Sequence, residues 1–572
     1  MFNKKFNLII ISTFIFFESK SQSAFAPLNQ DYLHLVERYE IKRGKFSEGF
    51  HSNVRPFTRQ GIVRLVDSIL VDPTIKLNYT DRLNLQYLQD DSWEFTQNKI
   101  GDSKQHLLKH FYHKKSDAYS ISNDDIDLHI SPVVDFNAGL VFKGNQKSVS
   151  MNSRGLEIRG MVSKKLGFYT YVTDNLGNSP EYVKNYADVY QNNELNLEKR
   201  AGMPGEGYVR NLNLVKNPYS VDFFSARAYI TFAPIKNMNI QFGHDKNIWG
   251  SGFRSMILSD FSAPYLFLKL TTHIGPVQYQ NLFCQLATPK YETNNVLFPK
   301  KYATFHHVSV NITKRLNIGL SETIIFERKK GDGIDLSYLN PVIFYRYAEG
   351  FQGSADNALL GMDMKYNFAK SYSVYGQMNL DELIVKEIFD TKKGYANNKY
   401  AAQIGLKCVD FLGIENLDTQ LEYDIARPFT FSHNSGSNFT HYNQALAHPF
   451  GANFREFNFI TRYQPNYKLQ LVARITSTNT GEDRNVNENW GSNLQKSYLK
   501  RSGDFGYFIG TGRSTYINTF DLRASYQFRH NLFFDARFIN RDYLSAKRSL
   551  NYTNTILSLG ARMNIGYRDN AF

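Results

Sequence analysis

The chain is poor in cysteine and lacks long apolar runs. Cys284 and Cys408 are the only cysteines in 572 residues, so neither a disulfide framework nor a Cys-x-x-Cys metal site can form. Both lie in segments with strand-like alternation, where we expect packed, inert thiols. Beyond the first residues, no stretch approaches the roughly eighteen apolar residues that a membrane-spanning helix requires.

Two further absences narrow the class of protein and of fold. No run of Lys and Arg marks a nucleic-acid patch, although the net charge is +14, so we expect no nucleic-acid partner. The basic balance instead suits acidic polysaccharide or lipid headgroups. No period of about 20 to 50 residues repeats, which argues against a propeller. The mean hydropathy of −0.43 is that of a soluble protein, but a membrane barrel needs only every second residue apolar.

The first residues predict an export signal. "MFNKK" is basic, and Leu8 to Phe17 form an apolar segment too short to cross a bilayer. Small residues suited to cleavage follow between Ser21 and Ala26, without a cysteine for lipid attachment. We expect residues 1–22 to be a signal peptide.

Residues 23–125 have helical periodicity. "NQDYLHLVERYEI", "TRQGIVRLVDSIL" and "TDRLNLQYLQDDSWEF" each place apolar residues on one face. Thr58 is the expected N-cap of the second helix, and Thr80 or Asp81 that of the third. We expect a small α-helical region whose apolar faces pack on one another.

From residue 126 to 572 the period becomes two. "FDLRASYQFRHNLFFDARFINRDY" (520–543) alternates apolar residues with charged ones, so one face suits a core or lipid and the other suits water. The charged face is expected to line a wet lumen. The lumen-lining residues are Asp418, Glu422, Asp424, Asp521, Arg523, Asp535 and Arg537.

The connections decide between a membrane barrel and a soluble all-β fold such as tandem sandwiches. Short turns near 164, 235, 275, 314, 369, 411, 464 and 529 alternate with long polar stretches, as in outer-membrane barrels. The count gives about eighteen antiparallel transmembrane strands. Phe572, at the end of an alternating segment, resembles the terminal aromatic by which such barrels are recognised for insertion. We therefore predict an all-β outer-membrane protein whose N-terminal region and C-terminus are periplasmic.

No sequence pattern predicts catalysis. The spacings of His306, His307, His433, His441 and His448 match no metal-ligand template, and "GSGFRS" lacks the setting of a nucleophile elbow. We expect no enzyme, no metal and no cofactor, although a Ser-His-carboxylate site formed across strands stays open.

The densest stretch is "GHDKNIWGSGFRSMILSDFSAPYLFLKL" (243–270). Trp249 and Tyr265 offer flat faces on which sugar rings stack, and Arg254 and Asp260 can hydrogen-bond a ligand. These four are the candidate ligand-binding residues, on an expected external loop. The alternative is an ordered loop folded over the barrel mouth.

This stretch resembles the "G…WG.G…S…LS…AP" segment of Wzi-type capsule assembly proteins, and more closely that of the RemB-type relatives of gliding bacteria. "LSYLNPVIFYRYAEGFQGSADNALLGMDMKYNF", "PLNQDYLHLVERYEIKRGKF" and "FTHYNQALAHPFGANFREF" are also similar to family segments. Ser251 stands where the capsule proteins usually have proline.

The resemblance implies an eighteen-stranded outer-membrane barrel with a periplasmic helical region and, in the capsule proteins, a lectin-like external face. Trp249, Arg254 and Asp260 are the positions carried over to that face. The leading hypothesis is a non-enzymatic barrel that assembles or attaches capsular or extracellular polysaccharide, or gliding-motility surface components. Expected partners are outer-membrane lipid, surface polysaccharide, and gliding or secretion machinery. The alternative is a porin-like diffusion channel for small anionic solutes.

Overall fold

The computed structural model describes residues 24–97, 101–104, 110–189, 203–207, 217–288, 299–328, 335–342, 344–352, 356–382, 392–433 and 436–569. The predicted signal segment 1–22 and Phe572 lie outside these residues. Within them, no helix combines the length and apolar character needed to cross a membrane.

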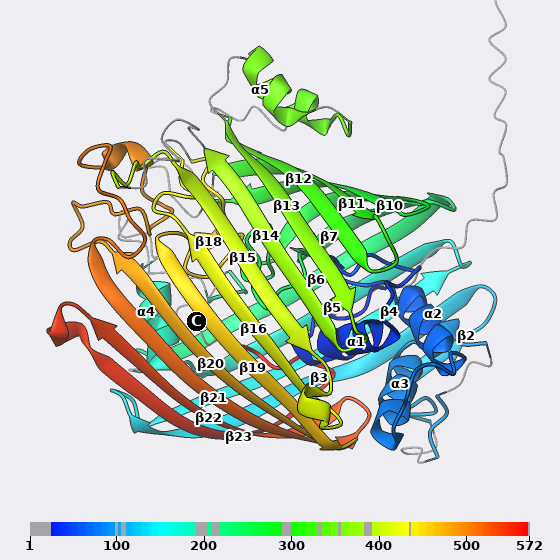
Figure 1. Ribbon diagram of the computed structural model, residues 1–572. Coiled ribbons are helices and arrows are strands. Elements are labelled where there is room, and N and C mark those ends of the chain that lie inside the picture. The colour runs from blue at the N-terminus through cyan, green and yellow to red at the C-terminus, as the bar shows by residue number, and fades with distance from the viewer. Residues whose placement is uncertain are drawn as a thin grey trace, which may run out of the picture.

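Three helices precede the barrel (Figure 1). They are α1 (Gln30–Arg43), α2 (Arg59–Leu70) and α3 (Tyr79–Asp91), followed by the 3-10 turn η1 (Trp93–Phe95). The Thr58 side chain accepts from the N–H of Gly61, as the predicted N-cap of α2 should. The prediction for α3 was wrong: Asn78 is the N-cap, and Asp81 completes a capping box from inside the helix. The helices share one apolar cluster, which includes Val36, Leu65 and Leu88.

Eighteen antiparallel strands form one closed barrel within the described residues, which confirms the predicted fold. They are β3 (Ile126–Lys143), β4 (Ser148–Val162), β5 (Leu166–Asn178), β6 (Ser220–Ile235), β7 (Met238–Asp245), β9 (Tyr265–Ile274), β10 (Val277–Ala287), β11 (Lys300–Asn311), β12 (Leu316–Phe326), β13 (Asn357–Phe368), β14 (Tyr372–Glu382), β15 (Lys399–Cys408), β16 (Leu417–Ala426), β19 (Phe454–Asn466), β20 (Leu469–Glu482), β21 (Arg513–Arg529), β22 (Leu532–Ser545) and β23 (Tyr552–Met563). β23 pairs with β3 and closes the cylinder. β2 (Tyr119–Ser122) pairs with β3 beside it.

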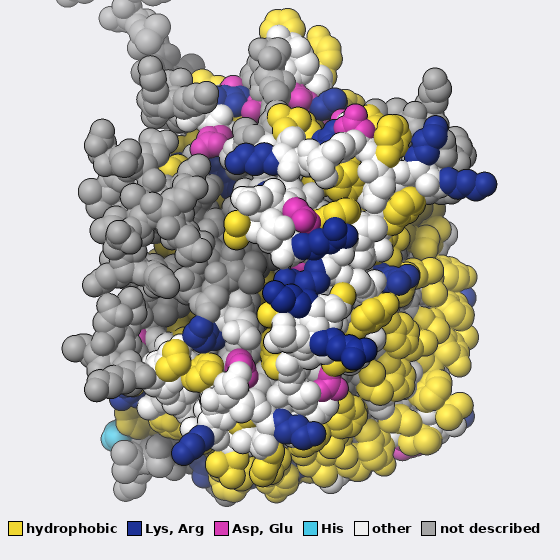
Figure 2. Space-filling view, turned by 90° about the vertical axis from the view of Figure 1, so that its left-hand side faces the viewer, with side chains coloured by type: hydrophobic (Ala, Val, Ile, Leu, Met, Phe, Trp, Pro, Cys, Tyr) yellow, Lys and Arg dark blue, Asp and Glu magenta, His cyan; other side chains and the backbone are white. Residues whose placement is uncertain are grey.

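Successive side chains along each strand point into the lumen and out toward lipid. On β21, Phe520 and Leu522 are 40% and 43% exposed on the outer wall, whereas Asp521 between them is 9% exposed. Figure 2 shows hydrophobic side chains gathered over the wall below the loops. Because hydrocarbon surrounds a membrane barrel, the apolar residues face outward and the charged ones inward.

The helices lie at the end of the barrel where the short turns are. Lys42 Nζ is 2.9 Å from Asp410 Oδ2 in the turn 409–416, and Tyr87 donates to Asn531 in the turn 530–531 at 2.5 Å. α1 also reaches into the lumen, where Arg38 pairs with Asp418 of β16. The helical region therefore covers the short-turn mouth.

The chain after α1 runs up inside the barrel. The strap, which we define as residues 44–57, includes β1 (Val54–Arg55), which pairs with β8 (Ile248–Trp249) of the connection between β7 and β9. Asn53 donates to Asp363 on the wall at 2.6 Å, and the Gly250 N–H donates to the Asn53 carbonyl at 2.7 Å. A segment from the short-turn end and one from the long-loop end thus meet inside the lumen.

The described part of the loop 328–357 neither folds into the lumen nor adds a strand to the barrel. It forms η3 (Leu336–Leu339) and α5 (Tyr345–Gln352), which pack on the outside of the wall. Tyr345 is buried against Ile324 and Phe326, whose side chains are on the outer face of β12.

The last strand also ends earlier than predicted. Alternation was expected to continue past Met563, but β23 stops there and the C-terminal tail, residues 564–569, turns into the lumen. Tyr567 accepts from Arg537 at 2.6 Å, and Asp569 is 2.9 Å from Arg474. Hydrogen bonds and ion pairs with charged residues inside the barrel stabilise the inward tail more than outward packing of Ile565 and Tyr567 would stabilise a longer strand.

Arg38→Ala tests how the helical region is held. Arg38 is buried and bonds to Asp418, Asp410 and Asp81, so its loss leaves three carboxylates without their common counter-charge. We expect a cost of about 3–5 kcal/mol. The measurements are trypsin sensitivity of the helical region and the temperature at which the purified barrel changes its electrophoretic migration. Arg64→Ala, exposed on α2, is the control; equal behaviour of the two variants would refute the role of Arg38.

Candidate functional site

The connection 246–264 folds into the lumen rather than over the outside, which corrects its prediction as an external loop. Trp249 is 0% exposed; its Nε1–H donates to Gln280 Oε1 at 2.7 Å. The indole stacks on His307 with ring centroids 4.8 Å apart. Tyr265, at the start of β9, is also buried. Neither ring offers a free face to a sugar in this conformation.

A glycine permits the close approach at the centre of this loop. Gly250 has φ +122°, and a Cβ there would lie 2.1 Å from Nε2 of Gln377. Gln377 in turn donates from Nε2 to the Trp249 carbonyl at 2.8 Å. The glycine therefore lets the backbone contact the barrel wall directly.

Glu422 holds the next part of the loop. Its carboxylate accepts from the N–H groups of Phe253 and Arg254 at 2.7 and 2.8 Å, and from the Tyr375 hydroxyl at 2.6 Å. Arg254 Nε is 3.0 Å from Glu456 Oε1. The structure thus places Arg254 as an anchor of the loop to the wall, in contact with protein carboxylates.

Asp424, His448 and Glu456 bring three possible metal-ligand atoms within 4.8 Å of one another. The Phe450 N–H donates to His448 Nδ1 at 3.3 Å, which leaves the ring proton on Nε2. Nε2 then donates to Glu456 at 3.2 Å. In this arrangement the group is a hydrogen-bonded network in which His448 has no lone pair left for a metal.

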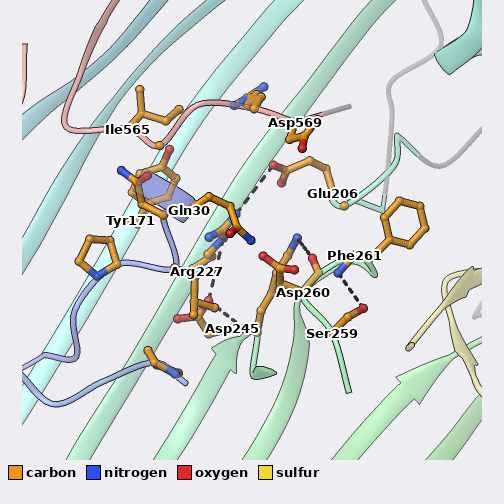
Figure 3. A pocket seen from close by; sticks show the side chains of 18 of the residues that line it. Gln30, Tyr171, Glu206, Arg227, Asp245, Ser259, Asp260, Phe261, Ile565 and Asp569 are labelled. Atoms are coloured by element: carbon orange, nitrogen blue, oxygen red, sulfur yellow. Dashed lines mark hydrogen bonds and ion pairs between the residues drawn. The ribbon is translucent and has the colours of Figure 1, made fainter. Parts of the chain in front are cut away.

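Asp260, the fourth candidate residue, lines a cavity of about 250 Å³ inside the barrel (Figure 3), and Arg254 lines it as well. The cavity is enclosed by residues 25–30 at the start of α1, the loop 246–261, residues 203–206 and the C-terminal tail, together with Pro56, Arg59, Ala447 and Pro449. Wall residues of β4 to β7, Glu157 among them, complete it. Among its lining residues are Tyr171, Glu206, Arg227, Asp245, Lys246, Phe261 and Arg568.

Arg227 stands between two carboxylates in this cavity. Its guanidinium is 3.9 Å from Glu206 and 4.0 Å from Asp245, and lies over the ring of Tyr171 at 5.6 Å. Ser225 donates to Glu206 at 2.7 Å. Burial raises the pKa of Glu206, but Arg227, Arg568 and Lys246 together with the Ser225 hydrogen bond outweigh it, so the pKa is lowered.

Two guanidinium N–H groups in the cavity wall have hydrogen-bonding capacity left. Among the described residues, no acceptor bonds to Arg227 Nε or to Arg568 Nη1, although both atoms are buried. Arg568 Nη2 donates to Asn175 at 2.6 Å, which fixes the side chain. Unused buried donors of this kind favour a ligand that brings acceptor oxygens.

Lys246 adds a third cationic group with a different character. Its Nζ donates to the Asp260 carbonyl at 2.9 Å. Burial and the neighbouring Arg227 lower the pKa of Lys246 to about 8, so only part of the Lys246 population is protonated in mildly alkaline solution. Phe261 lies next to these groups, and its N–H donates to Ser259 Oγ at 3.2 Å. The cavity therefore combines oxygen-binding donors with aromatic faces, as sugar sites do.

The predicted lumen-lining residues lie on the inward face and bind protein groups. Asp521 pairs with Arg537 at 2.6 Å, and Asp535 with Arg562 at 2.7 Å, each across neighbouring strands. Others bind the segments that fill the lumen or the wall itself: Asp418 bonds to Arg38 and His34, Arg523 to Asp31, Glu422 to the loop, and Asp424 to Gln403.

Asp31 on α1 shows how strong this pairing is. Its carboxylate is 2.6 Å from Arg523 and 3.6 Å from Arg562. Burial alone raises the pKa of Asp31, but the two arginines outweigh it and hold the pKa at about 2. The carboxylate therefore stays ionised throughout the neutral range.

Several cavity residues were missed from the sequence. Asp245 and Lys246 stand within the quoted stretch 243–270, and Arg227 is a charge in the middle of an apolar strand. A mid-strand charge signals the lumen but does not reveal which distant segment meets it. Glu206 lies in an irregular segment without any periodic signal, and Arg568 lies in a tail that was expected to continue as strand.

Glu422→Gln tests the anchoring of the inward loop. Glutamine keeps one acceptor but sets its own NH₂ against a backbone N–H, which costs about 1.5–3 kcal/mol for the lost charged hydrogen bond. We expect trypsin to cleave after Arg254 in the variant and not in the parent. Glu48→Gln, exposed in the strap, is the control. Resistance equal to the parent would contradict the anchoring role.

Comparisons with known proteins agree with this architecture. The family model described as capsule assembly protein Wzi matches residues 154–540. A search of curated proteins gives no match. Among solved structures, the chain is similar to Wzi of Escherichia coli, described as an outer membrane protein involved in group 1 capsule assembly and a carbohydrate-binding β-barrel. The TM-score is 0.56 at 14% identity, over 96% of this chain and 100% of that chain.

Other barrels are less similar. OprD of Pseudomonas aeruginosa has a TM-score of 0.40 at 11% identity, over 77% of this chain and 96% of its own. OccAB2 of Acinetobacter baumannii has 0.40 at 10%, over 76% and 97%.

Proposed function

This chain belongs to the Wzi family of capsule assembly proteins, and from that premise we propose that it is a non-enzymatic outer-membrane barrel that assembles capsular or extracellular polysaccharide or holds it at the cell surface. The observation that carries the proposal is the family match over residues 154–540, which includes the inward loop and Arg227, Lys246 and Asp260. The carbohydrate binding described for the Escherichia coli relative supports it.

The proposed orientation follows from the connections. Short turns of outer-membrane barrels are periplasmic and long loops are external. On this basis the helical region 23–125 is periplasmic, residues 1–22 are a signal peptide, and the long connections face outside. The contacts of Lys42 and Tyr87 with short turns support the placement of the helices.

The cavity suggests the chemistry of the bound unit. Its volume of about 250 Å³ is below the roughly 300–1,000 Å³ of typical ligand pockets, which suits one sugar ring or a substituent. Arg227 and Arg568 offer N–H donors, and Tyr171 and Phe261 offer aromatic faces. Guanidinium groups bind carboxylates well, so the proposed ligand is an acidic sugar of the polysaccharide.

A deletion strain tests the function in the cell. We expect it to lose surface-attached polysaccharide, measured as the ratio of cell-bound to released material, while total synthesis continues. The purified protein should bind acidic glycans on an array. Unchanged attachment together with an absence of glycan binding would refute the proposal.

Arg568→Ala and Arg227→Gln test the cavity. Each removes charged donors, so we expect binding of the acidic glycans to weaken by about tenfold, the equivalent of about 1.4 kcal/mol. Arg548→Ala, exposed on the connection between β22 and β23, is the matched control. Heat-modifiable migration verifies that each barrel is folded. Equal binding by all three variants would place the glycan site outside the cavity.

The diffusion-channel alternative makes an opposite prediction. Lys365 bonds to Glu40, and Lys407 bonds to Glu37; all four side chains are buried across the lumen. Because the helical region and the strap fill the lumen where these four side chains meet, we expect no large, steady single-channel currents in planar bilayers. Such currents from the intact protein would favour the channel.

The gliding role rests on the RemB-type resemblance. Co-purification with surface adhesins or their secretion complex would favour it over polysaccharide attachment.

A further inference from the structure

A row of polar residues crosses the outer wall of the barrel. In the strand register, His306 of β11 lies opposite both Asn281 of β10 and Glu322 of β12. All three alternate with inward residues, so they face the side on which lipid contacts the barrel. A charged or strongly polar group on the lipid face is costly, and each of the three is nevertheless buried.

The segment formed by residues 335–342 and 344–352 buries this row. Glu322 accepts from the N–H groups of Tyr345 and Arg346, the first residues of α5, at 2.8 and 2.9 Å. A carboxylate at a helix N-terminus is favourable because it satisfies free N–H groups. Tyr345 also hydrogen-bonds to His306, and Asn281 donates to the Pro341 carbonyl at 3.0 Å.

Apolar contacts seal the same face of the segment. Tyr338, Tyr345 and Ala348 pack on Ile324 and Phe326 of the outer wall. The segment is thus fixed to the outside of the barrel through its polar and aromatic side. A loop merely projecting into solvent would not need these contacts.

The opposite side of the segment is apolar and uncovered. Its large hydrophobic side chains are between 68% and 85% exposed: Leu336, Val342, Phe344, Tyr347 and Phe351. On the adjoining wall, Leu320, Leu360 and Met362 are also exposed and belong to the lipid-facing belt. α5 lies at the long-loop end of the barrel, at the top of Figure 1. Hydrophobic side chains are also visible at the top of the molecule in Figure 2.

We propose that residues 335–342 and 344–352 form a membrane-binding surface whose exposed apolar side inserts among the lipids around the barrel. Continuity with the lipid-facing belt identifies lipid as the occupant. The exposed Arg346 and the ring of Tyr347 suit the headgroup boundary, as in interfacial helices. The leaflet is the outer one if the proposed orientation holds, but the contact with lipid does not depend on polysaccharide binding.

Single cysteines carrying an environment-sensitive fluorophore test this surface in proteoliposomes. Cys284 and Cys408 are buried, and labelling of the parent protein measures their background. Phe351→Cys probes the segment, Leu559→Cys probes the exposed outer wall of β23, and Val486→Cys probes the polar connection between β20 and β21. Spin-labelled phosphatidylcholine quenches fluorophores in lipid, and iodide quenches those in water.

We expect spin-labelled lipid to quench the label at 351 within about twofold of the label at 559, and iodide to quench only the label at 486. Quenching of 351 by iodide alone would overturn the proposal. A label that is water-exposed in proteoliposomes but shielded in native outer membranes would assign the surface to a protein partner and would also overturn it. Heat-modifiable migration verifies folding of each variant. Because no glycan is present, this result is independent of the proposed function.

Discussion

The interior of this barrel depends on pairing buried charges. The wall presents many charged side chains to the lumen, and an ionised group removed from water is costly unless an opposite charge or hydrogen-bond donors meet it. Part of the pairing runs across strands, as between Asp521 and Arg537. The rest comes from the segments inside: Arg38 of α1 meets Asp418, and the loop amides at 253 and 254 meet Glu422. The wall and the filling segments therefore specify each other.

This constraint explains what the sequence could predict. Alternation along a strand reports which face is wet, so the eighteen strands, their short and long connections and the inward charges could be predicted. The same pattern does not say whether water or protein fills the wet side. Trp249 and Tyr265 were predicted to bind a ligand because the sequence does not show what surrounds them. In the structure, Trp249 contacts Gln280 and His307, and Tyr265 contacts Asn247. Local periodicity cannot encode a partner on a strand far away in sequence.

The candidate cavity illustrates the same limit. Its groups come from residues 25–30, Pro56 and Arg59, strands β4 to β7, the inward loop, residues 203–206, Ala447 and Pro449, and the C-terminal tail. Only Arg254 and Asp260 among these lining residues were chosen from sequence, because they stand in a dense aromatic and glycine-rich stretch. Arg568 carries a buried donor in a tail that was expected to continue as strand. Family membership, established over residues 154–540, adds what residue patterns alone lack: a reason to relate this interior to polysaccharide.

The two ends of the described chain meet inside the cylinder. Gly566 of the tail is so close to Asn29, the N-cap of α1, that a Cβ at 566 would lie 3.2 Å from the asparagine Cγ. Two segments far apart in the sequence therefore share one environment inside the barrel. The interior around Asn29 and Gly566 reaches its native packing only when both segments are present, so its completion is a late event in folding.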